Sequence, residues 1–222
     1  MIPLRDSQPS YSTPYVTIGL IVTNVLVFLY TVSLEPFSRN HFIVEYGMIP
    51  ARFQLIDLLT SMFMHGGWLH LIGNVWFLWI FGDNVEDVLG HGKYLLFYLL
   101  CGVAASLGHF ALSMESRVPT VGASGAIAGV MGAYLIKFPH SHIVTLVPVF
   151  VFVTTIEVPA VLMLLYWFVI QFFSGVGSIA QSQISQGGVA WFAHVGGFLA
   201  GMLLVLAMGR GERYRRRRDL YW

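Results

Sequence analysis

The sequence predicts an all-α membrane protein in which six helices cross the bilayer and the fourth helix is short. Of its 222 residues, 56% are hydrophobic and only 10% are charged, a balance that excludes an ordinary soluble domain. Six apolar stretches approach the roughly 20 residues that a helix needs to cross a hydrocarbon core of about 30 Å. A cluster of arginines follows the last stretch.

The expected spans cover residues 15–34, 62–81, 94–114, 124–138, 159–175 and 189–208. The stretch 143–158, between the fourth and fifth spans, is apolar and β-branched, with Pro148 inside it and Pro159 directly after it. It could be a further span or a segment lying at the membrane interface. We favour the interfacial segment, because proline interrupts helix geometry twice there.

Basic residues predict the orientation in the membrane. The tail RGERYRRRR after the last span places the C-terminus in the cytoplasm, and six spans then place the N-terminus there too. We therefore expect one domain over 1–222, with cytoplasmic segments at 1–14 and 209–222. The tail anchors this topology and should attract anionic lipid headgroups, whereas it gives no indication of nucleic-acid binding.

Polar residues gather at one depth when the chain is threaded in this way, because the second, fourth and sixth spans all begin at the outer face. A polar side chain within a span is costly unless it is partnered or hydrated, so such residues are functional candidates. The residues expected in the outer half are Ser124, His194, His65 and His70, with Asn74 near the midplane.

A serine and a histidine form the central candidate site. Ser124 lies in GASGAIAG and His194 in AHVGGFLAG. A serine hydroxyl is a weak nucleophile until a base removes its proton, and histidine titrates in the range suited to that task. The acidic residues lie in loops or near span ends and none lies within the fourth or sixth span, so we expect a Ser/His dyad without an acidic third member.

Each residue taken alone has a structural alternative. Ser124 could be a small packing residue beside Gly125 and Gly129, and His194 could be a hydrogen-bonded structural histidine, since small residues let membrane helices approach closely. Taken together they favour catalysis, because the glycines would bring the two helices within hydrogen-bond reach. The residues expected to support the serine or this close approach are Gly122, Ala123, Gly125, Gly129, Gly197 and Gly201.

Donors for a developing oxyanion are offered by the segment HGGWLHLIGN. His70 and Asn74 are four residues apart and share a helix face, and the backbone N–H of Ser124 is free at a helix start. One such donor stabilises a transition state by about 2.7 to 4 kcal/mol. His65 lies about 140° around the helix from His70, so we expect it only to support the site.

Other classes of site fit less well. A metal centre is disfavoured because HExxH is absent, no acidic ligand is near the histidines and the only cysteine is Cys101. The nucleophile elbow of soluble hydrolases requires glycine where this chain has Ala126. A transporter would show an internal repeat or charged residues within its spans. The sequence contains no cofactor motif, and it leaves the oligomeric state open.

These segments, together with FGDNVEDVLG, resemble the rhomboid family of intramembrane serine proteases, in the order typical of that family. The resemblance implies that Ser124 attacks the peptide bond, that His194 acts as base and then acid, and that His70 and Asn74 stabilise the oxyanion. It implies substrates that are transmembrane or membrane-tethered proteins, cleaved toward the outer face. A non-catalytic member that binds transmembrane helices is the alternative.

The same resemblance assigns the pattern GxxxExxxG to Gly82, Glu86 and Gly90, in a structural role within the cytoplasmic turn between the second and third spans. This chain departs from some relatives at Ala128, where they carry a tyrosine packed on the histidine, and in the first outer loop, which reads EYGMIPARF. The orientation of His194 is therefore left open, as are individual roles in that loop.

Access to the site is expected from the lipid side, under a mobile cap formed by residues 175–188. Trp167, Phe172 and Phe173 are candidates for a lateral gate, although aromatic residues near an interface more often anchor a helix. We expect the protein in a prokaryotic cytoplasmic membrane, with its active site toward the outer face.

Overall fold

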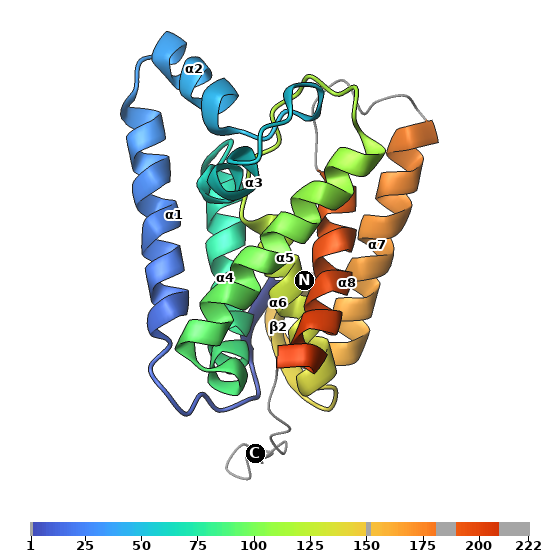
Figure 1. The fold of residues 1–222 in the computed structure, drawn as a ribbon. Coiled ribbons are helices and arrows are strands. Elements are labelled where there is room, and N and C mark those ends of the chain that lie inside the picture. The colour runs from blue at the N-terminus through green and yellow to red at the C-terminus, as the bar shows by residue number, and fades with distance from the viewer. Residues whose placement is uncertain (1, 150–151, 181–189, 209–222) are drawn as a thin grey trace.

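The computed structural model describes residues 2–149, 152–180 and 190–208 (Figure 1). Long helices running roughly side by side form the body of the molecule, and short helical segments cover one end. The long helices are α1 (Tyr15–Ser33), α4 (Trp68–Leu89), α5 (His91–Leu112), α6 (Ser124–Lys137), α7 (Ala160–Ala180) and α8 (Trp191–Met208). The short segments are α2 (Pro36–Tyr46), η1 (Pro50–Arg52), α3 (Asp57–Thr60) and η2 (Ser61–Phe63).

Helix α6 forms the centre of the bundle. Every residue from 125 to 135 is buried, and α4, α5, α7 and α8 all contact this helix. It begins at Ser124 and is only 14 residues long, as the sequence predicts for the fourth span. A cavity lies next to the first residue of this short helix, and α2 and α3 cover that end of the bundle (Figure 1).

Glycines allow α6 and α8 to pack backbone against backbone. A Cβ added at Gly197 would overlap the carbonyl oxygen of Gly125, and one added at Gly201 would overlap the backbone of Gly129. The other side of α6 is as close to α5, since a Cβ at Gly125 would lie 2.5 Å from the Cβ of Ala105. Such close approach maximises van der Waals contact between apolar helices.

The second span extends further along the chain than the sequence predicts. Helix α4 runs to Leu89, so Gly82 and Glu86 lie in its last turns, and only Gly90, with φ +75°, forms the turn into α5. The reason is that Glu86 has buried partners at the start of α1: its carboxylate accepts hydrogen bonds from the N–H groups of Val16 (2.9 Å) and Thr17 (2.8 Å). A carboxylate at a helix N-terminus is favourable.

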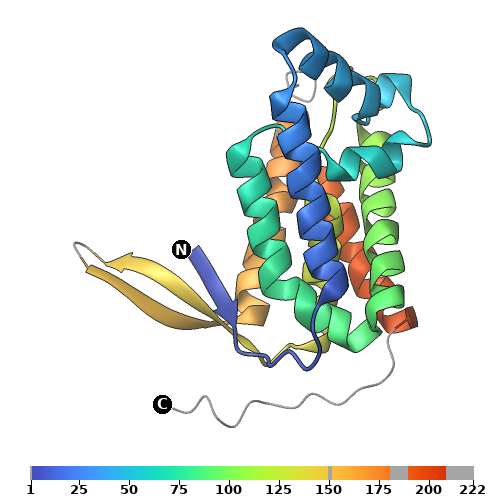
Figure 2. The same cartoon turned by 90° about the vertical axis from the view of Figure 1, so that its left-hand side faces the viewer.

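The chain is mostly helical, as expected, but it is not all-α, because it also contains a three-stranded antiparallel sheet. Strand β1 (Ile2–Asp6) pairs with β2 (His142–Val149), which pairs with β3 (Phe152–Pro159). The described residues of the stretch 143–158 are therefore two paired antiparallel strands rather than a helical span, and these strands project from one side of the bundle (Figure 2). The β-branched residues of this stretch favour strands, and Pro159 ends β3 directly before α7.

Four helices of the described residues are long and apolar enough to cross a membrane, namely α1, α5, α8 and residues Ala160–Gly177 of α7. Helix α4 carries Asp83, Glu86 and Asp87 near its end, and α6 is shorter than a full span. The protein is thus a multi-pass membrane protein, while the count of six spans stays a prediction. Residues 181–188 of the expected cap and the basic tail 209–222 lie outside the described residues.

Candidate functional site

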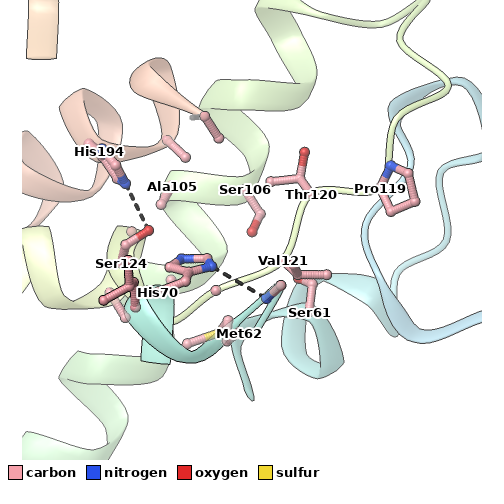
Figure 3. A pocket seen from close by; sticks show the side chains of 18 residues that line it. Ser61, Met62, His70, Ala105, Ser106, Pro119, Thr120, Val121, Ser124 and His194 are labelled. Carbon is pink, nitrogen blue, oxygen red and sulfur yellow. Dashed lines mark hydrogen bonds between the residues drawn. The ribbon is translucent and has the colours of Figure 1, made fainter. Parts of the chain in front are cut away.

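Ser124 and His194 lie side by side where α6 meets α8 (Figure 3). Ser124 is the first residue of α6, and His194 lies in the first turn of α8. The distance from Ser124 Oγ to His194 Nε2 is 2.7 Å. The backbone contact of Gly125 with Gly197 lies directly beside this pair, so the glycines bring the serine and the histidine within hydrogen-bond reach.

The other nitrogen of His194 has a partner that the sequence analysis did not identify. Gln171 Oε1, on α7, lies 2.6 Å from His194 Nδ1. A carboxamide oxygen only accepts hydrogen bonds, so Nδ1 carries the proton and donates it to Gln171. Nε2 is then unprotonated and accepts the hydrogen bond from the Ser124 hydroxyl. The only sequence signal for Gln171 was an amide within an apolar helix.

His70 closes the opposite side of the serine. Its ring lies so close to Gly122 that a Cβ added there would be 2.7 Å from Nε2, and Gly122 adopts φ +131°, where glycine is favoured. The N–H of Gly66 approaches His70 Nδ1 at 3.4 Å, which leaves Nε2 as the protonated nitrogen. Gly122 is held by its N–H bond to the carbonyl oxygen of Ser61, 2.9 Å away, and buried Ala123 leads into α6.

Asn74 and His65 contact the site less directly than His70 does. The Nδ2 group of Asn74 donates to the carbonyl oxygen of His70, one turn earlier on α4, at 2.7 Å. One amide hydrogen is thus used within the helix. The Asn74 side chain nevertheless lines, together with Ser124, a groove between α4 and α7. His65 is buried and contacts His70 edge to face, with ring centroids 5.2 Å apart, so it touches the site only through His70.

Two hollows meet at the serine and the histidine. The first, here called the outer cavity, has a volume of about 570 Å³ and includes Ser61, Ser106 and Thr120 in its lining (Figure 3). The second, here called the lateral groove, has a volume of about 320 Å³ and lies between α4 and α7, with Phe77 and Trp167 on its two sides. Ser124, His70 and His194 line both hollows.

The three aromatic residues predicted as candidates for a lateral gate occupy different places in the structure. Trp167 lines the lateral groove, and its ring lies 5.8 Å from that of His194. Phe172 and Phe173 do not line that groove; their side chains are exposed and contact each other edge to face. Only Trp167 therefore lies where it could affect access to Ser124.

Within residues 2–149, 152–180 and 190–208, no group of three histidine, cysteine or acidic side chains is arranged to hold a metal ion. The site is instead a hydroxyl, two imidazoles and an amide, with a backbone N–H at the start of α6. This set of groups suits acyl transfer, in which a base activates a hydroxyl and N–H donors stabilise an oxyanion.

Comparison with known proteins gives consistent matches. The family model described as Rhomboid domain matches residues 52–211. The chain is 44% identical to rhomboid protease GluP of Bacillus subtilis over 78 residues, which are 35% of this chain and 15% of that protein. It is 30% identical to the mitochondrial rhomboid protein 1 of Saccharomyces cerevisiae over 170 residues, 74% of this chain and 45% of that protein.

A further match is the mitochondrial presenilin-associated rhomboid-like protein of Homo sapiens, 31% identical over 139 residues, which are 60% of this chain and 36% of that protein. The chain thus spans less than half the length of these curated relatives. Because they include bacterial and mitochondrial proteins, the prokaryotic cytoplasmic membrane stays a prediction.

Proposed function

The chain belongs to the rhomboid family, and we propose that it is an intramembrane serine endopeptidase that hydrolyses peptide bonds in or next to transmembrane segments of other proteins. The observation that carries the proposal is the 2.7 Å hydrogen bond between Ser124 Oγ and His194 Nε2. The bond from His194 Nδ1 to Gln171 supports it, because it gives Nε2 the lone pair that a general base needs.

The reaction follows from these proton positions. Ser124 Oγ attacks the carbonyl carbon of the scissile bond while its proton passes to His194 Nε2. The imidazolium then donates this proton to the leaving amide nitrogen, which leaves an acyl-enzyme on Ser124. Water, activated by Nε2, attacks the acyl carbon, and the proton returned by His194 restores the serine hydroxyl.

The oxyanion formed in each half of the reaction needs donors beside Ser124. The backbone N–H of Ser124 has no partner within its own helix because Ser124 is the first residue of α6. His70 Nε2–H is the second donor, since His70 lines both hollows at the serine. Each contributes about 2.7 to 4 kcal/mol to lowering the barrier. Asn74 either donates its remaining amide hydrogen to the oxyanion or only fixes, through its bond to the His70 carbonyl oxygen, the helical turn that carries His70.

The two hollows suit a substrate that comes from lipid and a reaction that needs water. The lateral groove is lined largely by apolar side chains such as Phe77, Met131 and Trp167, so an extended segment of a transmembrane substrate fits there. A helical segment must unwind first, because helical hydrogen bonds and side chains shield its carbonyl carbons from attack. The outer cavity contains hydroxyl groups and gives water a place beside Ser124. In the topology with both termini cytoplasmic, it opens toward the outer face.

The test is cleavage of a model transmembrane substrate by the purified full-length protein in liposomes, read by gel and mass spectrometry. Ser124→Ala and His194→Ala should each abolish the products while the thermal unfolding transition stays near that of the wild type. Ser33→Ala is the control, because Ser33 is an exposed serine at the end of α1 that lines neither hollow, so its loss should leave cleavage intact. Products that persist in Ser124→Ala would contradict the dyad.

A covalent probe gives a second, independent readout. A fluorophosphonate reacts with an activated serine and should label the wild type but not Ser124→Ala. Stable binding of several transmembrane segments with neither products nor labelling would instead identify a non-catalytic, helix-binding member of the family.

A further inference from the structure

Gln171 stands out among the residues of the site because an uncharged amide occupies the place beside His194 where a serine hydrolase often has a carboxylate. It is the only amide side chain in α7 and is 8% exposed. A buried amide is costly unless it is hydrogen-bonded, and here Oε1 accepts the Nδ1–H of His194 at 2.6 Å. The bond joins α7 directly to the proposed base.

The chemistry of an amide suits this position. A carboxylate would fix the same tautomer of His194 but would bring a charge into a membrane-spanning helix, which is expensive. A carboxamide does not ionise, so it orients the ring at every pH without that cost. This also answers how His194 is held in a chain with Ala128 one turn after Ser124.

Helix α7 is packed on one side only. Its contacts with α8 are largely aromatic: the Trp167 and Phe168 rings lie 6.1 and 4.9 Å from that of Phe198. One turn beyond Gln171, Gly175 lies against α8: a Cβ added there would be 3.1 Å from the ring of Phe192 and 3.2 Å from the Cβ of Trp191. Much of the rest of α7 is exposed, including Leu162, Tyr166, Val169 and Phe173. Neither Gly175 nor Gly177 of α7 lies as close to a neighbouring backbone as Gly201 lies to Gly129.

The same helix forms one wall of the lateral groove, and Gln171 itself lines it. Moving α7 away from α4 or α8 widens the groove and lengthens the bond between Gln171 and His194. We propose that Gln171 is the positioning residue of His194, and that it makes the docking of α7 onto α8 a condition for an active base. The proposal rests on the protease function proposed above.

The first experiment compares Gln171→Leu, Gln171→Glu and the control Tyr166→Phe, an exposed position on the same helix. We expect Gln171→Leu to lower kcat about 10- to 100-fold, as for residues that orient a metal-bound imidazole, and to change KM much less than kcat. Gln171→Glu retains an acceptor for the Nδ1–H of His194 and should lower kcat less than Gln171→Leu does. Its carboxylate should also move the acidic limb of the pH profile to higher pH, because it stabilises the imidazolium. The other titratable groups facing His194 are His70 of α4 and His109 of α5.

The second experiment tests the docking of α7 with a matched pair of glycines. Gly175→Leu places side-chain atoms against Phe192 and Trp191, whereas a Cβ at Gly177 meets nothing within 4 Å. In protein labelled with ¹⁵N-histidine, the wild type should show His194 protonated at Nδ1. Gly175→Leu and Gln171→Leu should both shift that signal toward mixed tautomers, and Gly177→Leu should not.

The outcomes separate this proposal from the proposed function. A wild type that neither cleaves substrate nor reacts with a fluorophosphonate contradicts the protease, while the tautomer readout still tests Gln171. An active wild type whose kcat and His194 signal are unchanged in Gln171→Leu overturns the positioning role. Faster cleavage by Gly175→Leu with an unchanged His194 signal overturns the coupling of α7 to the base.

Discussion

Two of the neighbours of helix α8, namely α6 and α7, hold it in different ways. Against α6 it packs backbone to backbone, at Gly125 with Gly197 and at Gly129 with Gly201. Against α7 it packs through aromatic rings and through the hydrogen bond between Gln171 and His194. The first contact has no side chain that can rotate to relieve a change, whereas the second is made of side chains that can.

The difference separates two requirements of the proposed dyad. The distance between Ser124 and His194 depends on the contact of α6 with α8, which is rigid because backbone atoms meet. The tautomer and ring orientation of His194 depend on α7, which is exposed on its other side. Substitutions in the first contact should therefore reduce stability and activity together, while those in the second should reduce activity more than stability.

The largest effect is expected for Gly201→Ala. The added Cβ would overlap Gly129, so α6 and α8 must separate, at a cost of about 3 kcal/mol in stability. Cleavage should be lost because Ser124 and His194 move apart. Thermal unfolding in detergent and cleavage assays measure both effects, with Gly19→Ala as the control, since nothing lies within 4 Å of a Cβ there. A stable, fully active Gly201→Ala protein would remove the distinction between the two contacts.

A smaller loss of stability is expected for Trp167→Ala on the other side of α8. The ring packs on His194 and Phe198 but is only partly buried. We therefore expect a loss of about 1 to 2 kcal/mol, less than for a tryptophan in a full core. The cleavage rate should fall, because the Trp167 ring packs on that of His194, and Trp167→Phe should restore part of it. The control is Trp79→Ala, whose side chain is exposed. A stability loss as large as that of Gly201→Ala would contradict the comparison.

The sequence predicted the contact of α6 with α8 better than the contact of α7 with α8. Ser124, His194 and the glycines beside them belong to short segments whose chemistry and spacing can be recognised, and the resemblance to the rhomboid family is confirmed. Gln171 could not be assigned, because its contact with His194 joins positions 23 residues apart and depends on how α7 turns about its axis. That angle is set by tertiary packing and not by hydrophobic periodicity.

The other differences have local causes. Hydropathy alone does not distinguish a buried or interfacial strand from a helix, so the sequence identifies the stretch that forms β2 and β3 only as an apolar, β-branched segment, at the interface or crossing the membrane. The acidic residues after Phe81 resembled a loop, whereas Glu86 and Asp87 use their charge to bind the N-H groups that precede and begin α1. A prediction from the sequence could not know that those donors lie beside them.

The smallest effect on cleavage is expected at the far end of α6, where β1 contacts Tyr134. Tyr134 Oη donates a hydrogen bond to Asp6 Oδ2 at 2.5 Å, and burial raises the pKa of Asp6 from 3.8 to about 7. Between those values the folded protein holds a proton that the unfolded chain has released, so stability falls as pH rises from about 4 to 7 and is level below that range. Asp6→Asn, which retains an acceptor for Tyr134, should flatten this part of the curve of unfolding temperature against pH. An equally steep curve in Asp6→Asn would assign the dependence to another group, with neighbouring Asp83 as the first to test.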